Sequence, residues 1–332
     1  MNNKPIIGIL LGDATGIGPE IATKLAVESY YDEFCRPVFI GDARVFQMGL
    51  DTFKGKTNYY VISDMSQADW TKGYPVLDLK DQDPAKIKYG APDPYCGQGV
   101  LHQIDKAMEF CKAGKIDGVL ISPLNKTAII EGGCKFASEC EYMADILGVK
   151  TAYCESNVLD GLMTVRVTSH IPAKDISSHL TIENIFENIE LCQITAKSFG
   201  IKEPRIAVCA FNPHAGENGL CGREEIDVIK PAIDKAIQKG WNVSGPIPAD
   251  SVFPRAFRGE YDAVVTMFHD QGQIALKLRA FAQGVTVFAG LGYPICTCAH
   301  GTAYGKAGKG IADTTSIKNT LQTVAKMASN WK

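Results

Sequence analysis

The chain has 332 residues, of which 45% are hydrophobic and 21% charged, and its formal net charge is -3. This length predicts two lobes rather than one small core. The charge gives no electrostatic argument for nucleic acid or an anionic membrane, and no apolar run approaches the roughly 20 residues that span a bilayer. The N-terminal residues lead into a strand-like run without a signal peptide, and the 11 scattered cysteines favour reduced thiols. We therefore expect a cytoplasmic protein with neither a membrane nor a nucleic-acid partner.

Short β-rich runs alternate with helical patterns along the chain. Strands are predicted at 5–11, 37–41, 117–123, 163–168, 205–210 and 263–268, and helices at 19–31, 98–113, 181–199, 223–239 and about 313–330. Residues 51–95 are rich in turn residues and show no clear period. Because strands that alternate with helices are typical of a mostly parallel sheet covered by helices, we expect an α/β fold.

Three of the six histidines each follow a predicted strand, in a loop with proline, glycine or acidic neighbours. They are His170 after 163–168, His214 after 205–210 and His269 after 263–268. Ligands of open α/β sheets collect at the carboxyl ends of strands, so we expect the three imidazoles in one cleft. Three imidazoles hold a divalent cation and leave positions for a substrate, which predicts an open metal site. A purely structural role for each histidine is the alternative.

Charged side chains near these strand ends are candidates for proton transfer. Lys277 follows His269 by eight residues, and a lysine near a divalent cation can accept a proton. Asp270 lies beside His269, and Asp250 follows a loop that two prolines stiffen. For the carboxylates the alternative is a role in capping or turns, and for the lysine an ordinary surface position.

Two glycine-rich segments are candidate nucleotide sites. Residues 12–20, GDATGIGPE, form a strand-to-helix turn whose backbone N–H groups suit an anion. Asp42 after the second strand suggests a dinucleotide fingerprint, but Ile21 replaces the third glycine and Pro19 removes a donor, which favours a structural turn. Residues 300–313, HGTAYGKAGKGIAD, predict either a site for a nucleotide phosphate or adenosine, or a flexible loop.

Seven motifs together resemble one family. In chain order they are GDATGIGPE, SPLNK, TSHIP, NPHAGENG, GPIPADSVF, MFHDQGQIALK and HGTAYGKAGKGIAD. This set, spread over nearly the whole chain, is similar to the 4-hydroxythreonine-4-phosphate dehydrogenases of pyridoxal phosphate biosynthesis and their 4-phospho-threonate, erythronate and dihydrodiol relatives. The last motif also resembles the nucleotide loop of the isocitrate and isopropylmalate dehydrogenases.

The resemblance implies a two-lobed α/β/α fold similar to the isocitrate and isopropylmalate dehydrogenases, with the active-site cleft between the lobes. It implies a discontinuous first lobe of residues 1–130 with about 280–332, and a second lobe of about 131–279 that carries the dimer interface. The active protein would be a homodimer, in which His269 serves the partner's site.

By the same resemblance, the cofactors are NAD, or NADP, and a divalent metal. Zinc is the expected metal, with Mg, Mn, Co or Ni as alternatives, and its ligands would be His170, His214 and His269. NAD would bind without a Rossmann fingerprint, at Gly301, Thr302, Ala303, Lys309 and Asp313.

The implied reaction is the oxidation of a secondary alcohol in a small hydroxy acid. The metal acts as a Lewis acid on the hydroxyl, a base takes the proton, and hydride passes to NAD. The catalytic residues would be Lys277, Asp250 and Asp270. A β-keto acid product could then lose carbon dioxide.

Two departures from the family concern substrate binding. Where relatives carry Gly-His-Thr-Glu, whose His-Thr pair helps hold the substrate phosphate, this chain has Ser138–Glu141, and the Glu139 anion would repel a phosphate. An arginine and an asparagine of the family are replaced by Ile295 and Thr286. The residues expected at the substrate are Glu139, Cys140, Asn125, Lys126, Thr286 and Ile295.

These departures predict a substrate that is unphosphorylated, or whose phosphate is held elsewhere. One alternative is the standard activity on 4-hydroxythreonine-4-phosphate or 4-phospho-threonate, with the phosphate held by other residues. An alternative of another class is a protein that binds NAD and metal without catalysis.

Overall fold

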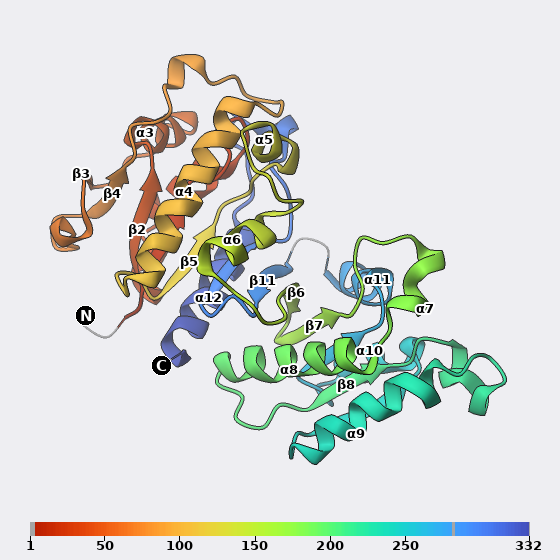
Figure 1. Ribbon diagram of the computed structural model, residues 1–332. Helices are drawn as coiled ribbons and strands as arrows, with labels where there is room; N and C mark the ends of the chain where they lie inside the picture. The colour runs from red at the N-terminus through yellow and green to blue at the C-terminus, as the bar shows by residue number, and fades with distance from the viewer. Residues whose placement is uncertain (1–3, 281–282, 332) are drawn as a thin grey trace. The chain divides into compact units, whose positions relative to one another are not determined.

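The computed structural model describes residues 4–280 and 283–331, which divide into two compact units (Figure 1). The first unit is Met1–Val149 with Leu291–Lys332, and the second is Lys150–Gly290. These boundaries differ from the expected ones near 130 and 280. Helix α6 (Glu139–Leu147) belongs to the first unit because it packs against helix α4 (Pro94–Lys112). Strand β11 (Val285–Ala289) belongs to the second because it pairs with β6 (Cys154–Leu159).

The first unit contains a parallel sheet with the strand order β3-β4-β2-β1-β5-β12. Its strands are β1 (Ile6–Leu10), β2 (Arg36–Gly41), β3 (Tyr59–Ile62), β4 (Tyr74–Asp78), β5 (Gly118–Ile121) and β12 (Ile295–Cys298). β5 is buried throughout and β1 nearly so, which is why their sequences are continuous apolar runs rather than alternating ones.

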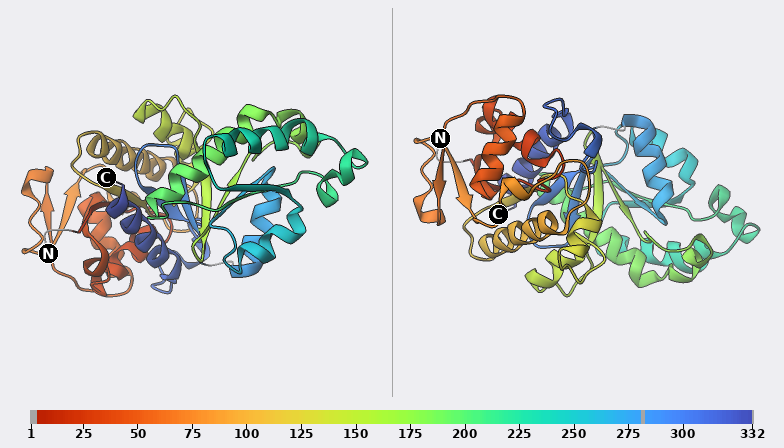
Figure 2. Two further views of the ribbon diagram at one scale, coloured as in Figure 1. Left: turned by 90° about the horizontal axis from the view of Figure 1, so that it is seen from below. Right: turned by 90° about the horizontal axis from the view of Figure 1, so that it is seen from above.

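Helices cover both faces of this sheet (Figure 2). They are α1 (Gly18–Val27), α2 (Tyr31–Phe34), α3 (Ala43–Thr52), α4, α5 (Lys126–Glu131), α6 and α12 (Thr315–Asn330), with 3₁₀ turns at Met65–Gln67, Pro84–Lys86 and Tyr304–Lys306. α4 begins at Pro94, where the Asp93 side chain accepts hydrogen bonds from the first free backbone N–H groups. α4 packs on β1 and β2, and α12 packs on β5 and β12 from the opposite face.

The second unit has the strand order β11-β6-β7-β10-β8-β9, in which the last four strands are parallel and β6 is antiparallel to both neighbours. The further strands are β7 (Leu162–Arg166), β8 (Ile206–Cys209), β9 (Val243–Ile247) and β10 (Ala263–Thr266). The helices are α7 (Ile176–His179), α8 (Ile182–Ser198), α9 (Lys230–Gln238), α10 (Ala249–Ala256) and α11 (His269–Ala280), with 3₁₀ segments at Ala173–Asp175 and Pro213–Gly219 and a π-helical segment at Glu225–Ile229.

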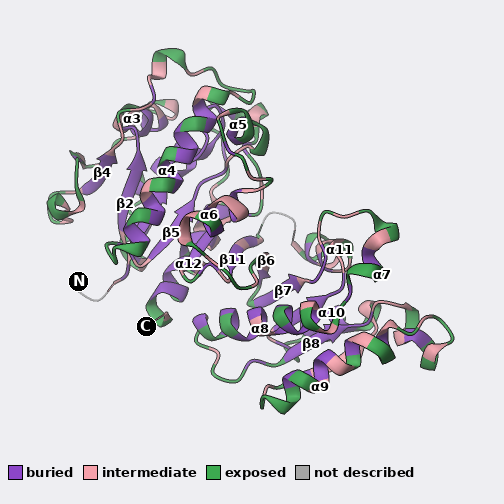
Figure 3. Ribbon diagram, viewed as in Figure 1, coloured by how far each residue is buried: buried purple, intermediate pink, exposed green. Residues whose placement is uncertain are grey.

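The strands form the buried centre of each unit, and the outer faces of the helices are exposed (Figure 3). In the second unit, α8 lies on one face of the sheet and α10 and α11 lie on the other (Figure 2). A core cluster that includes Leu162, Ala207, Val252 and Val264 holds α10 against the sheet. The 11 cysteines form no disulfide, and burial raises the thiol pKa of several buried ones, for example that of Cys298 to about 11.

The predicted two-lobed α/β fold is confirmed, since helices cover both faces of the sheet in each unit. Each predicted strand and helix is present with somewhat different ends. The short strands β3, β4, β6, β9, β11 and β12 were not predicted: β3 and β4 lie in the turn-rich residues 51–95, and polar residues, glycine or proline interrupt the apolar pattern of the others. Among the described helices, none is long and apolar enough to cross a membrane.

Candidate active site

The carboxyl ends of four neighbouring parallel strands in the second unit carry the predicted catalytic residues. β7, β10, β8 and β9 lie side by side in this order, so the chain leaves all four at the same edge of the sheet. His170 follows β7, His269 follows β10, His214 follows β8, and Asp250 follows β9. The three histidines therefore lie along one edge of one sheet, where ligands of parallel sheets bind.

His170 and His269 approach each other, with ring centroids 5.8 Å apart and ring planes inclined by 45°. The Thr168 hydroxyl donates to the carbonyl of Met267 at 2.8 Å, which ties the end of β7 to the end of β10. His269 begins α11, and its Nδ1 lies 2.7 Å from Asp270 Oδ1. A carboxylate on Nδ1 orients an imidazole and leaves its Nε2 for a cation, so Asp270 is placed to orient His269, and its catalytic role stays a prediction.

His214 lies in a loop with an unusual backbone. The five residues His214–Asn218 all have positive φ, from 47° to 78°. Left-handed residues other than glycine each cost about 1–2 kcal/mol, so other contacts have to hold this loop. The buried carboxylate of Glu225 accepts from the backbone N–H of Asn212 at 2.7 Å and from its side-chain amide at 2.9 Å. His214 Nδ1 lies 2.9 Å from Glu217 Oε1, so a carboxylate orients this imidazole as well.

The donor set suits a first-row divalent cation, because imidazole nitrogen is a ligand that zinc prefers. Among the residues that the structure describes, however, no three side chains of histidine, cysteine, aspartate or glutamate lie close enough to hold a metal ion together. The structure brings His170 and His269 together and leaves His214 apart. The His214 side chain is 71% exposed, so a change of rotamer meets little resistance.

Both further candidates for proton transfer are exposed. Lys277 lies eight residues after His269 on α11, about two helical turns away, and Gln273 lies midway between them. At this spacing of four, the three side chains share one stripe of the helix. Asp250 lies in the first turn of α10.

In the first unit, hydrogen bonds join the two glycine-rich segments, which we call the glycine turn (residues 12–18) and the nucleotide loop (residues 300–313). Tyr304 donates its hydroxyl to Asp13 Oδ2 at 3.0 Å, and the backbone N–H of Ile17 donates to the carbonyl of Thr302 at 3.1 Å. A Cβ on Gly16 would lie 2.7 Å from the Thr302 Cβ, so a side chain at this position would push the loop away. The glycine turn thus supports the nucleotide loop.

A buried ion pair extends this contact toward the last helix. Lys24 Nζ lies 2.8 Å from Glu20 Oε1 and donates to the carbonyls of Gly310 and Ala312. The Glu20 carboxylate also accepts from the backbone N–H of Ala312 at 2.8 Å. The end of the nucleotide loop is therefore held firmly.

Asp13 is the carboxylate at the centre of the glycine turn, and it is fully buried. Desolvation raises its pKa, although hydrogen bonds from Thr15 and Tyr304 act in the opposite direction. A buried carboxylate with a raised pKa reduces stability at neutral pH, and such groups concentrate at functional sites.

The predicted NAD-binding residues are mostly accessible. Gly301, Ala303, Lys309 and Asp313 are exposed, while Thr302 is buried beneath them. The Asp313 carboxylate accepts from a backbone N–H at the start of α12, which lowers its pKa. These exposed residues are accessible to a nucleotide, and their role in NAD binding stays a prediction.

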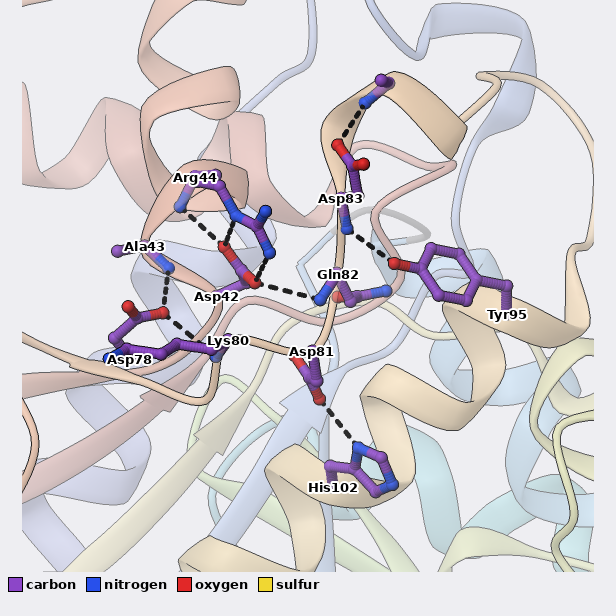
Figure 4. Close-up of polar contacts among 11 residues, drawn as sticks. Asp42, Ala43, Arg44, Asp78, Lys80, Asp81, Gln82, Asp83, Tyr95 and His102 are labelled. Carbon is purple, nitrogen blue, oxygen red and sulfur yellow. Dashed lines mark hydrogen bonds and ion pairs between the residues drawn. The ribbon is translucent and has the colours of Figure 1, made fainter.

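Asp42 is not available to a nucleotide ribose. Figure 4 shows its carboxylate directed at Arg44 and at the backbone of Gln82. Asp42 accepts from the backbone N–H and guanidinium of Arg44 and from the Gln82 N–H at 2.9 Å, and these contacts lower its pKa. The side chain caps α3 and is fully buried, so the structure agrees with a structural role rather than a Rossmann site.

The expected substrate residues of the first unit lie at the starts of two helices. Glu139 begins α6 and is buried, and its Oε2 lies 3.9 Å from Lys126 Nζ. The helix N-terminus also stabilises this anion. Asn125 caps α5 by accepting from the backbone N–H of Ala128 at 2.9 Å. Cys140 is buried beside Glu139.

The remaining two expected substrate residues differ in burial. Ile295 is 0% exposed in β12, where it pairs with Val119 of β5. Its side chain packs in the core, so the expectation that it contacts substrate is corrected: an apolar residue inside a covered parallel strand is part of the fold. Thr286 on β11 is half-buried and accepts a hydrogen bond from Asn157 Nδ2 at 3.3 Å.

Sequence reasoning missed three polar residues of the second unit that lie close to the histidines: Arg166, Asn157 and Gln273. Arg166 and Gln273 both donate hydrogen bonds to Asn157, and Arg166 also donates to Ser169, the residue before His170. A signal was present, since Arg166 is a charged residue at the end of an apolar strand pattern.

The chain resembles known proteins along nearly all of its length. A relative from Rhizobium meliloti (strain 1021), provisionally named 4-hydroxythreonine-4-phosphate dehydrogenase 2, is 40% identical over 98% of this chain and 94% of its own. A relative from Clostridium botulinum (strain Langeland), provisionally named D-threonate 4-phosphate dehydrogenase, is 33% identical over 100% of this chain and 99% of its own.

Solved structures agree with these relatives. A 4-hydroxythreonine-4-phosphate dehydrogenase from Burkholderia phymatum has a TM-score of 0.86 at 36% identity and covers 98% of this chain and 99% of its own. A terephthalate 1,2-cis-dihydrodiol dehydrogenase from Burkholderia xenovorans LB400 has a TM-score of 0.70 at 26% identity, over 97% and 98%.

Fold, site and relatives together define an oxidoreductase, a dehydrogenase that acts on CH–OH groups. The family model of the pyridoxal phosphate biosynthetic protein PdxA matches residues 33–324. The chain belongs to the PdxA family.

Proposed function

We propose that this protein oxidises a secondary alcohol in a small phosphorylated hydroxy acid, with NAD as the hydride acceptor. The observation that carries the proposal is the placement of His170, His214 and His269 at the carboxyl ends of β7, β8 and β10. The names of the relatives, which specify phosphorylated hydroxy acids, supply the substrate class.

The three histidines would hold a divalent cation, with zinc as the expected metal and Mg, Mn, Co or Ni as alternatives. Such a cation, when bound, polarises a hydroxyl and a neighbouring oxygen. By the resemblance to the family, His269 would serve the partner's site, although its ring approaches that of His170 within one chain. Asp270 and Glu217 orient two of the imidazoles through their Nδ1 atoms.

Lys277 is our candidate for the base that takes the hydroxyl proton. NAD would accept the hydride from the carbon that bears this hydroxyl. Its place on the His269 stripe of α11 supports this role. Asp250, after the neighbouring strand β9, is the alternative base. NAD, or NADP, would bind at the nucleotide loop, above the support that the glycine turn gives it. Loss of carbon dioxide would follow if the product is a β-keto acid.

The active form would be a homodimer. Large apolar side chains near the candidate site are exposed: Ile274 and Leu278 on α11 are 57% and 83% exposed, and Leu220 after the His214 loop is 88% exposed. A second copy that covers these side chains would remove apolar area from water. A sedimentation experiment on the purified protein tests this assignment, and a monomer at micromolar concentration would contradict it.

A second candidate substrate is an unphosphorylated hydroxy acid. The observation in its favour is the buried Glu139 carboxylate, which occupies the start of α6 and pairs with Lys126. A phosphate beside it would meet like charge.

NADH formation on matched pairs of substrates tests the function. The protein would be assayed with 4-hydroxythreonine-4-phosphate, with D-threonate 4-phosphate and with their unphosphorylated counterparts. We expect a higher kcat/KM for a phosphorylated member. A preference for an unphosphorylated member would support the second candidate, and no NADH with any hydroxy acid would contradict both.

A further inference from the structure

The loop that carries His214 closes around one buried carboxylate. Glu225 begins the π-helical segment that follows this loop, and it is 3% exposed. Its Oε1 accepts from the backbone N–H of Phe211 at 2.8 Å and from that of Asn212 at 2.7 Å, and its Oε2 accepts from the Asn212 side-chain amide at 2.9 Å. The segment between β8 and His214 therefore directs three N–H groups at a single side chain.

The middle of the left-handed turn, residues 214–218, lies against the same carboxylate. A Cβ built on Gly216 would lie only 2.7 Å from Glu225 Oε2. The Gly216 carbonyl in turn accepts from the backbone N–H of Cys221 at 3.0 Å, which closes the far side of the turn. The carboxylate thus contacts the turn at its entry and at its centre, so the backbone that carries His214 depends on the side chain at position 225.

The turn needs this support because its backbone is unfavourable. Its four residues other than Gly216 have φ between 47° and 55°, a conformation that is costly for residues with a Cβ. The His214 side chain is largely exposed, so packing of the imidazole contributes little. Hydrogen bonds to an ionised carboxylate are about twice as strong as neutral ones, which makes Glu225 the contact best suited to hold the turn.

We propose that Glu225 is a positioning residue for the metal site: its carboxylate holds residues 214–218 in the left-handed form and thereby presents the His214 imidazole to the divalent cation. This role rests on the proposed function, since it presumes that His214 binds the cation, whichever chain supplies the other ligands. Glu217 orients the His214 ring through Nδ1, whereas Glu225 acts on the backbone that carries both residues.

Direct binding of the cation by Glu225 is one competing role. The two carboxylate oxygens already accept three N–H groups, and Gly216 lies against Oε2. A carboxylate in this setting orients the groups around it, and residues behind metal ligands typically change metal affinity by about 10–100-fold when they are replaced. A role in stability alone is the other alternative, and it predicts an unchanged metal affinity.

The adjacent Glu224 provides a matched control. Its Oε2 lies 2.7 Å from the Asn212 amide nitrogen, which donates to Glu225 as well, and its Oε1 accepts from the Ser177 hydroxyl at 2.7 Å. The two carboxylates therefore share one amide and one helix start, but the backbone N–H groups of Phe211 and Asn212 donate to Glu225. The same substitution at both positions separates the backbone contacts from the mere loss of a charge near the turn.

The test is a Co²⁺ titration of the metal-free protein, followed by the visible absorption of the bound ion. In Glu225→Gln an amide of nearly the same volume replaces the carboxylate, and its single oxygen cannot accept from all three donors. Gly216→Ala disturbs the turn from the other side of the contact and leaves the carboxylate in place. Ala215→Gly, added to Glu225→Gln, removes a Cβ from a left-handed residue and so favours the original turn again.

We expect Glu225→Gln and Gly216→Ala to bind Co²⁺ about 10–100-fold more weakly, with an altered spectrum and native circular dichroism. Glu224→Gln should keep the affinity of the unaltered protein. Ala215→Gly in the Glu225→Gln background should recover part of the lost affinity, which a role in stability alone would not produce.

Unaltered affinity and spectrum in Glu225→Gln, or in Gly216→Ala if Glu225→Gln does not fold, would overturn the positioning role. An equal loss in Glu224→Gln would overturn it too, as would a double variant that recovers no affinity, because the loss would then not come from the backbone of the turn. Failure of the unaltered protein to bind Co²⁺ would instead overturn the proposed function, and the positioning role with it.

Discussion

The imidazole rings of His170 and His269 lie 5.8 Å apart, although one follows β7 and the other begins α11. The adjacent strands β7 and β10 bring them together, and the contact between Thr168 and Met267 ties the two strand ends. His214 follows the next strand, β8, on a left-handed loop. This arrangement places the three proposed metal ligands at one edge of the sheet.

His214→Ala should abolish metal binding at stoichiometric zinc and lower kcat/KM by at least about 100-fold. Because His214 is largely exposed, the free energy of unfolding should change by less than roughly 1 kcal/mol. Metal content measured after dialysis, together with chemical denaturation, checks both parts. Unchanged metal content in the variant would exclude the three-histidine site.

Lys277→Met should lower kcat by about 10²–10⁴-fold, the usual range for loss of a general base. The lysine is exposed on α11, so Co²⁺ affinity and the melting temperature should not change. Steady-state kinetics and the Co²⁺ titration separate these effects. If Lys277→Met retains full kcat while Asp250→Asn loses it, the carboxylate after β9 is the base.

Gly16→Ala should weaken NADH binding by roughly tenfold, equivalent to about 1.4 kcal/mol. The added methyl group would lie 2.7 Å from the Thr302 Cβ and displace the nucleotide loop. Calorimetric titration with NADH measures the effect, and Co²⁺ affinity in the same variant is the control, since those ligands belong to the second unit. If Gly16→Ala and the unaltered protein bind NADH with equal affinity, the nucleotide loop does not bind the cofactor.

Asp13→Asn should increase the free energy of unfolding at pH 7. Burial raises the pKa of this carboxyl above its ordinary value of 3.8, so its favourable contribution is complete below that value and is lost as the pH rises through the raised pKa. The variant's advantage should therefore shrink as the pH falls toward 4, where the carboxyl of the unaltered protein is protonated. Urea denaturation at several pH values checks the sign, and a variant that is less stable at pH 7 would refute it.

Glu139→His combined with Cys140→Thr should raise kcat/KM for a phosphorylated substrate. The change removes the carboxylate that pairs with Lys126 and leaves the ammonium and the start of α6 for an anion. The ratio of kcat/KM for the phosphorylated and unphosphorylated members of a pair is the measurement. An unchanged ratio would mean that phosphate does not bind beside α6. A further change of Ile295 to arginine would not help, because Ile295 is buried in the core.

The sequence predicts the α/β fold and the strand-end placement of the histidines well, because long apolar runs and the residues that follow them are local features. Short strands such as β9, which contains Gly245 and Pro246, have no such pattern. The role of Asp42 depends on where Gln82 lies, and the link between Asn157 and Gln273 joins residues far apart in the chain, so no local pattern predicts either. Ile295 was expected at the substrate because it replaces an arginine of the family, and the sequence alone does not show that this position is buried.

The central claim is metal-assisted oxidation of a phosphorylated hydroxy acid at the three histidines. The most direct test is NADH formation by the purified protein with D-threonate 4-phosphate or 4-hydroxythreonine-4-phosphate, before and after removal of metal with a chelator. The account predicts turnover that is lost on chelation and restored by zinc or cobalt in the unaltered protein but not in His214→Ala. Turnover that is insensitive to the chelator, or equal in His214→Ala, would contradict it.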